Sequence, residues 1–118
     1  SQIQNFIRNT LKDPYIAKEN PSIMVLNGTS TSGLATAKSE LLKSYGYNVV
    51  SVGDAPTSSY TRTTIVDMTG GKKKFTLHYI EKRFGVKSTT KLPDPAIQAT
   101  GADFVVILGQ DATANSEN

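Results

Sequence analysis

The segment Ile23-Met-Val-Leu-Asn-Gly-Thr-Ser-Thr-Ser-Gly33 decides the fold, because it joins an apolar run to a polar loop that holds two glycines. Residues 23–26 are all apolar and are followed by turn residues, which is typical of a strand buried on both faces. Apolar side chains then recur at helical spacing over residues 34–45, and a glycine follows. The segment therefore predicts a strand, a polar loop and a helix in succession.

The predicted helix over residues 34–45 has a recognisable start and one apolar face. Thr31 or Ser32 can cap its first turn with a hydroxyl group. The face that we expect to be buried consists of Leu34, Leu41 and Tyr45, with the stem of Lys38 beside them.

The rest of the chain repeats this layout. Three further strands are predicted, over residues 47–52, 61–68 and 103–108. A second helix runs from Gly70-Gly71 to Gly85, with Leu77, Ile80 and Phe84 as its core stripe, and residues 86–101 are mostly connector.

The order of these elements predicts an α/β domain of βαββαβ type. We expect a small mixed sheet of about four strands packed by two helices, with two right-handed strand–helix–strand crossovers. An extra amphipathic helix over residues 2–11, with a linker to residue 21, precedes the domain over 22–111, and residues 112–118 form a disordered tail.

Composition excludes several kinds of chemistry. The 118 residues include no Cys and a single His, so we expect no disulfide, thiol nucleophile, metal site or cofactor. His78 lies off the helical core stripe and is expected on the surface, no G-x-S-x-G motif surrounds a serine, and the aspartates form no acid–base pair. We therefore expect no catalytic residue in this chain. It also contains no apolar run of about 18 residues, the length needed to span a membrane.

The loop between the first strand and helix is a candidate ligand site. Gly28 and Gly33 match the spacing of a phosphate-binding loop, but Leu34 and Ala35 stand where that loop needs Lys and Ser or Thr. Free backbone N–H groups and hydroxyls could still hold an anion or a sugar, or the glycines could simply make a tight turn. The candidate ligand-binding residues are Asn27, Gly28, Thr29, Ser30, Thr31, Ser32 and Gly33, together with Asp111 after the last predicted strand.

Positive charge is concentrated in residues 72–91, which hold seven Lys or Arg against one Glu, a net charge of +6. The remaining residues carry a net charge of −3, so the overall +3 hides a local basic segment. Such a segment is usually a solvated face, but it can also bind an anionic polymer or a partner protein. The candidate surface is Lys72, Lys73, Lys74, Phe75, Tyr79, Lys82 and Arg83.

Two other interpretations of the basic segment stay open. Basic and aromatic residues together also suit single-stranded nucleic acid, but the chain has no RRM-type motif, and we expect no nucleic-acid partner. Alternatively, Phe75 and Tyr79 are covered by Ile3, Phe6 and Ile7 of the N-terminal helix, or by a second copy of the chain in a dimerisation module.

Several short segments follow one another in a specific order over residues 22–111. They are Val25-Leu-Asn-Gly-Thr29, Ser32-Gly-Leu-Ala35, Tyr45-Gly-Tyr47, Val49-Val-Ser-Val-Gly53, Thr61-Arg-Thr-Thr-Ile-Val66, Arg83-Phe-Gly-Val86 and Ala102-Asp-Phe-Val-Val-Ile-Leu-Gly-Gln-Asp111. Together they resemble the LytR C-terminal domain family. The triple lysine is not part of the shared pattern, and the family often has a smaller residue at Leu77.

The resemblance implies a non-catalytic accessory domain of a bacterial cell-envelope protein. In that family the domain follows a LytR–CpsA–Psr domain that transfers glycopolymers to peptidoglycan, or stands alone behind a membrane anchor. The resemblance thus implies an extracytoplasmic location, a longer membrane-anchored parent protein, and wall polymer or an envelope protein as partner. The matching motif residues are Asn27, Gly28, Gly33, Leu34, Ala35, Gly109 and Asp111. The alternative is a small enzyme or binding domain that uses the Gly28–Gly33 turn for a phosphorylated ligand.

Overall fold

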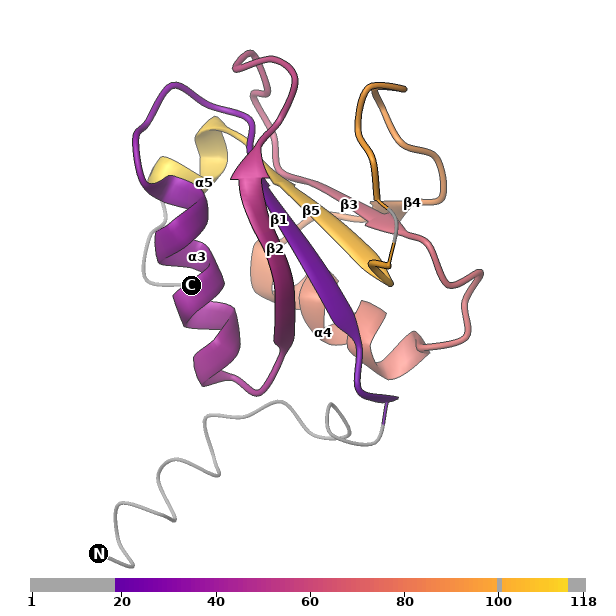
Figure 1. Cartoon of the computed structure of the whole chain (residues 1–118). Helices are drawn as coiled ribbons and strands as arrows, with labels where there is room; N and C mark the ends of the chain where they lie inside the picture. The colour runs from indigo at the N-terminus through magenta and orange to yellow at the C-terminus, as the bar shows by residue number, and fades with distance from the viewer. Residues whose placement is uncertain (1–18, 100, 115–118) are drawn as a thin grey trace, which may run out of the picture.

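Two strand–helix–strand units flank a central strand in the computed structural model, which describes residues 19–99 and 101–114 (Figure 1). The first unit consists of β1 (Ser22–Asn27), α3 (Leu34–Ser44) and β2 (Asn48–Asp54). The second consists of β3 (Thr64–Asp67), α4 (Lys74–Phe84) and β4 (Ser88–Thr89). The chain continues through β5 (Phe104–Leu108) and α5 (Gln110–Ala114). The helix predicted over residues 2–11 lies outside the described residues.

The five strands form one mixed sheet in the order β2-β1-β5-β3-β4, which confirms the small mixed α/β fold. β1 is parallel to both β2 and β5, whereas β3 is antiparallel to β5 and parallel to β4. The second strand–helix–strand unit, which begins with β3 and α4, therefore ends in β4. We had predicted that it ends in the strand at residues 103–108. The two-residue β4 is too short to leave a pattern in the sequence. The connector after it lets the chain re-enter the sheet at its centre.

The helices lie on one face of the sheet and the connector after β4 lies on the other (Figure 1). The central strands are buried on both faces, which is why their sequences are continuously apolar. Residues that face the helices include Ile23, Val25, Ile65, Phe104, Val106 and Leu108. Residues that face the connector include Met24, Leu26, Val66, Val105 and Ile107, with Ile97 from the connector itself packed on them.

Helix α3 differs from the prediction in its start and in its buried face. Its N-cap is Gly33, in the left-handed conformation at φ 79°, and no side chain caps the helix, so the predicted Thr31 or Ser32 cap is wrong. The buried residues are Leu34, Ala35, Lys38, Ser39 and Leu42. Leu42 thus takes the core position expected for Leu41, because it lies four residues after Lys38 in the middle of the buried stripe, whereas Leu41 lies at the border of that stripe.

Helix α4 begins later than predicted and ends where expected. Gly70 and Gly71 both have positive φ and form the turn before the helix, whose N-cap is Lys73. Gly85 closes the helix at φ 68° and its N–H donates to the Glu81 carbonyl at 2.8 Å.

The described part of the C-terminus is helical where we expected a loose tail. Helix α5 follows β5 after a single residue, and Ala112 is buried in the core on the helical face. The buried side chain of Ala112 thus packs residues beyond Asp111 against the domain.

Candidate functional site

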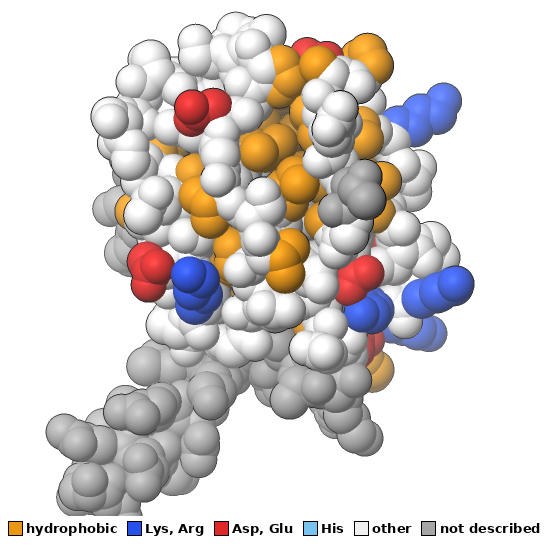
Figure 2. Space-filling model, in the orientation of Figure 1, with side chains coloured by type: hydrophobic (Ala, Val, Ile, Leu, Met, Phe, Trp, Pro, Cys, Tyr) orange, Lys and Arg blue, Asp and Glu red, His pale blue; other side chains and the backbone are white. Residues whose placement is uncertain are grey.

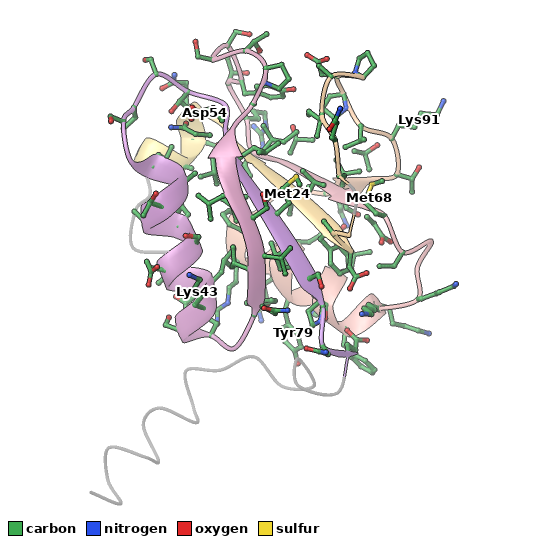
Figure 3. All side chains as sticks on the ribbon, in the orientation of Figure 1. Met24, Lys43, Asp54, Met68, Tyr79 and Lys91 are labelled. Atoms are coloured by element: carbon green, nitrogen blue, oxygen red, sulfur yellow. The ribbon has the colours of Figure 1, made fainter. Side chains whose placement is uncertain are left out.

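The polar loop of residues 27–33 lies at the sheet edge where β1, β2 and β5 all end. These three strands are parallel, so their carboxyl ends meet at one edge, which is the usual ligand-binding edge of open α/β sheets. The structure therefore brings the loop together with the residues that follow β2 and β5. Figure 3 shows this edge at the top, beside the labelled Asp54.

Asn27 holds the loop in shape and is not free to bind a ligand. Its Oδ1 accepts hydrogen bonds from the Thr29 N–H at 2.9 Å and the Thr29 hydroxyl at 2.7 Å. Its Nδ2 donates to the Thr31 carbonyl at 2.7 Å, and the Thr31 N–H donates to Thr29 Oγ1 at 3.1 Å. Asn27 and Thr29 are buried, so both candidate residues act as internal supports.

Gly28 serves close backbone packing. Its N–H donates to the Leu108 carbonyl at 2.9 Å, and its carbonyl accepts from the Tyr60 N–H at 3.0 Å. A Cβ at this position would lie 2.7 Å from the Leu108 carbonyl oxygen and from the Tyr60 ring. A glycine is therefore required where β1, β5 and the segment before β3 converge.

Asp111 lies at the same edge but supports a different segment. Its Oδ1 accepts from the Thr63 N–H at 2.9 Å and from the Thr63 hydroxyl at 2.7 Å. The Thr63 hydroxyl oxygen in turn accepts from the Gly109 N–H at 3.2 Å. Asp111 is not among the residues that line the groove described next.

An open groove separates loop 27–33 from the segment 54–58 that follows β2. Ala55 N–H donates to the Asn27 carbonyl at 3.0 Å and ties the two walls together at the base. The exposed hydroxyl side chains in the groove are Ser30, Thr31, Ser32, Thr57 and Ser58. Asp54 is the only charged residue among those that line it. The groove therefore offers many neutral donors and acceptors, one carboxylate and no cation.

A second hollow lies on the other side of the same segment. It is lined by polar residues that include Thr57, Tyr60, Arg62 and Asp94. Burial raises the pKa of the Tyr60 phenol, and the nearby Asp94 charge adds to the effect, so this hydroxyl remains a hydrogen-bond donor at neutral pH.

The predicted basic surface divides into an exposed face and residues with other roles. Lys72 is exposed before α4, and the helix exposes Lys74, Phe75, His78 and Lys82. Lys74, His78 and Lys82 recur every four residues and so share one face of the helix. The exposure of His78 confirms its expected place on the surface.

Three predicted members of this basic surface make contacts within the domain. Lys73 Nζ lies 2.7 Å from Asp103 Oδ2, and the guanidinium carbon of Arg83 lies 3.4 Å from the centre of the Tyr45 ring. Tyr79 is half-buried against the helix-side core and is not an open aromatic platform. The exposed aromatic of this surface is Phe75.

A cluster that the sequence did not predict lies at the opposite end of the sheet, where β1 and β5 begin. The Glu19 carboxylate accepts from the Phe75 N–H at 3.1 Å, the Thr76 N–H at 2.6 Å and the Thr76 hydroxyl at 2.5 Å. A residue that we assigned to a linker thus caps α4, while Asp103 accepts from the Ser22 N–H at 3.0 Å beside Lys73. Partial burial raises the pKa of Asp103, but the bonds from Lys73 and Ser22 outweigh it and leave this pKa below its usual value.

The turn before α4 repeats the turn before α3. Asp67 Oδ1 accepts from the Thr69 N–H at 2.8 Å and the Thr69 hydroxyl at 2.6 Å, as Asn27 does from Thr29. In both turns the last residue of a buried strand is Asn or Asp, and a Thr follows two residues later. This short pattern is the signal in the sequence that marks Asp67 as a supporting residue, although Asp67 was not among the predicted site residues.

Within residues 19–99 and 101–114, no cluster of three His, Cys, Asp or Glu side chains could hold a metal ion. Over the same residues, no helix has the length and apolar character to cross a bilayer.

A comparison with protein families places residues 20–111 in the family described as LytR cell envelope-related transcriptional attenuator. Searches of curated proteins and of solved structures find no match. The match covers most of the chain and includes the groove, all five strands of the sheet and the exposed face of α4. The chain therefore belongs to the family of the LytR C-terminal domain, an accessory domain of cell-envelope proteins.

Proposed function

We propose that this accessory domain lies outside the cell membrane, performs no catalysis, and binds neutral sugar units of a wall polymer in the groove between residues 27–33 and 54–58. The observation that carries the proposal is the lining of the groove, which is rich in hydroxyl groups and has no basic side chain. Membership of a cell-envelope family makes wall glycan the relevant source of such sugars.

The chemistry of the groove suits a sugar better than a phosphate. A Ser or Thr hydroxyl both donates and accepts, so it can pair with a sugar hydroxyl in either direction. The Asp54 carboxylate can accept from a sugar hydroxyl, but it repels a phosphate group. The phosphorylated-ligand alternative thus lacks the cation that it would need.

The loop is also held in place before any ligand arrives. The bonds from Asn27 to Thr29 and Thr31 fix the backbone that presents Ser30 and Ser32. Preorganisation lowers the entropy lost on binding, although an open polar groove still implies weak affinity, on the order of millimolar for a single sugar unit.

An NMR titration with soluble peptidoglycan fragments tests this proposal. We expect shifts of amides in residues 27–33 and 54–58 that persist as salt is raised, because a neutral sugar forms no ion pair in the groove. The double variant Ser30→Ala/Ser32→Ala should lose them, whereas Thr90→Ala, which changes an exposed threonine outside the groove, should not. A flat titration at millimolar fragment would refute sugar binding. Shifts caused instead by polyprenyl phosphates would favour the alternative.

The exposed face of α4 supports a second candidate function, the binding of an anionic wall polymer. Its basis is the placement of Lys74 and Lys82 on one face, with His78 between them, Phe75 next to Lys74 and Lys72 nearby. Binding through charge should weaken steeply as salt is raised. Retention on purified teichoic acid should fall in Lys74→Ala/Lys82→Ala and persist in Lys43→Ala/Lys91→Ala, which removes equal charge elsewhere. An equal loss of retention in both double variants would mean that binding depends on the net charge of the chain and not on this face of α4.

A further inference from the structure

The groove between residues 27–33 and 54–58 meets the second hollow at a single residue. Thr57 lines both, and its hydroxyl lies 3.3 Å from the hydroxyl of Ser59, which lines the second hollow. Figure 2 shows mostly neutral surface where the loops after β1 and β2 lie in Figure 1. A ligand that occupies the groove therefore needs to pass only Thr57 to reach the second hollow.

Two opposite charges line the second hollow. They belong to Arg62, which is exposed, and to Asp94, which is half-buried, and no other charged residue of the described part of the chain lines it. No ion pair joins these two side chains, and Arg62 forms none with any other described residue. Asp94 Oδ1 accepts from the Ala96 N–H at 2.9 Å, and no described residue bonds its other carboxylate oxygen. Both charges are therefore available to a ligand.

The backbone that carries Arg62 is held firmly against the end of the sheet. The Tyr60 N–H donates to the Gly28 carbonyl, and the Tyr60 carbonyl accepts from the Gln110 N–H, both at 3.0 Å. Arg62 itself packs so closely on Gly109 that a Cβ at that glycine would lie 2.3 Å from the Arg62 carbonyl carbon. The position from which the guanidinium extends is thus fixed before a ligand binds, which lowers the entropy lost on binding.

We propose that the second hollow binds the charged end of a peptide, with both a carboxylate and an ammonium group, attached to the glycan in the groove. The inference rests on the sugar-binding function proposed above, because the groove holds the glycan that carries the peptide. Arg62 binds the carboxylate through two parallel N–H···O bonds, the strongest geometry for this pair. Asp94 accepts from the ammonium group, and the protonated Tyr60 phenol is a further donor to the carboxylate.

Charge favours this ligand over one that carries a single kind of charge. A phosphate group is attracted by Arg62 but repelled by Asp94, and a simple amine experiences the reverse. A peptide residue with a terminal carboxylate and a side-chain ammonium pairs with both side chains, and such complementarity determines specificity. Each exposed charge pair should raise the affinity roughly two- to fivefold, and both together up to about tenfold.

NMR titrations of the 118-residue chain with four versions of one wall disaccharide test the inference. The first version carries a stem peptide whose only charges are the ammonium and the terminal carboxylate of a final lysine. In the second the amine is acetylated, in the third the carboxylate is amidated, and the fourth has no peptide and no charge. All four should shift amides of residues 27–33. Only the first should also shift residues 60–64 strongly and bind up to about tenfold more tightly than the fourth, a gain that should shrink as salt is raised.

Variants of the two charged residues assign each contact. Arg62→Gln should bind the first probe no more tightly than the third, because no guanidinium remains to pair with the carboxylate. Asp94→Asn should bind the first probe no more tightly than the second, and Asn keeps the oxygen that accepts from the Ala96 N–H. Lys91→Gln and Glu40→Gln are the matched controls, since they remove the same charges at exposed positions outside both hollows, and they should bind like the wild type.

The inference and the proposed function fail on different observations. If all four probes shift the groove equally and none shifts residues 60–64, the inference is overturned and the sugar groove stands. If the control variants lose the gain as Arg62→Gln and Asp94→Asn do, only net charge matters and the inference is likewise overturned. If no probe shifts residues 27–33 or 54–58, it is the proposed function that is refuted.

Discussion

At the scale of single residues, the loops of this domain are held by side chains and glycines that face inward. Asn27 and Asp67 each accept two bonds from a threonine two residues later and shape the turns before α3 and α4. Gly28 and Gly109 leave no room for a side chain against a neighbouring backbone. Asn27, Gly28 and Gly109 thus support the loops at this end of the sheet, while the hydroxyls of Ser30 and Ser32 are exposed.

Gly109→Ala should strongly destabilise the fold, because the added Cβ would overlap the backbone of Arg62, which cannot move like a side chain. We expect a loss of about 2–4 kcal/mol in the free energy of unfolding, measured by urea denaturation. Gly53→Ala is the control, since its Cβ would lie 3.8 Å from the Leu26 side chain, an ordinary contact. Equal stability of the two variants would contradict this account of Gly109.

At the scale of secondary structure, helices α3 and α4 differ in how they begin. Gly33 starts α3 with no side-chain cap, beside the polar groove. Helix α4 begins with a run of lysines, which oppose the helix dipole, yet its first N–H groups are bound by the Glu19 carboxylate. The acidic cap therefore offsets the unfavourable charge at that helix start.

Glu19→Ala should weaken α4 by removing this cap. We expect the free energy of unfolding to fall by about 1–2 kcal/mol, the range for loss of a charged N-cap. Hydrogen exchange of the Phe75 and Thr76 amides should become faster. Glu40→Ala is the control, because its exposed pair with Lys43 contributes little. An unchanged exchange rate at Thr76 would show that Glu19 does not cap the helix in solution.

At the scale of the whole molecule, Asp103 joins parts that are distant in the sequence. It accepts bonds from Ser22 at the start of β1 and from Lys73 at the start of α4. Its folded-state pKa is lowered, so the charged form is favoured by folding. The resulting stabilisation is present above the unfolded pKa of about 3.9 and is lost as pH falls through the folded-state pKa.

Asp103→Asn should therefore lower stability at neutral pH, by about 1–3 kcal/mol for a hydrogen-bonded charge. The difference from the wild type should shrink as the pH falls below about 4, because the unfolded chain then takes up a proton at Asp103 before the folded protein does. Unfolding curves at several pH values measure this, with Asp54→Asn, at an exposed aspartate, as control. A difference that stays constant down to pH 2 would contradict the assigned role.

Much of the fold could be predicted because local patterns carry it. The continuous apolar runs at residues 23–26 and 104–108 predicted buried strands, and Gly85 predicted the end of α4. The position of β4 could not be predicted, since two residues have no periodicity. Helix α5 was missed because five polar and small residues give no apolar stripe.

The candidate site was predictable only in part, for a related reason. The loop of residues 27–33 is contiguous, so its composition alone marks it as polar and glycine-containing. Its second wall, residues 54–58, could not be assigned to the site from the sequence, because nothing local links it to the first wall. The same holds for Lys73, which belongs to a basic run in sequence but is paired with Asp103 in space.

The amino-acid sequence by itself determined the longer strands and helices, the absence of thiol chemistry and the family, because these depend on residue types and short-range spacing. Tertiary structure decided which strands are neighbours, which lysines are exposed, and that Glu19 caps a helix more than fifty residues away. It also decided that β2, and not a central strand, is left at a long open edge. These features depend on contacts between distant residues, and the packing of the whole sheet selects them.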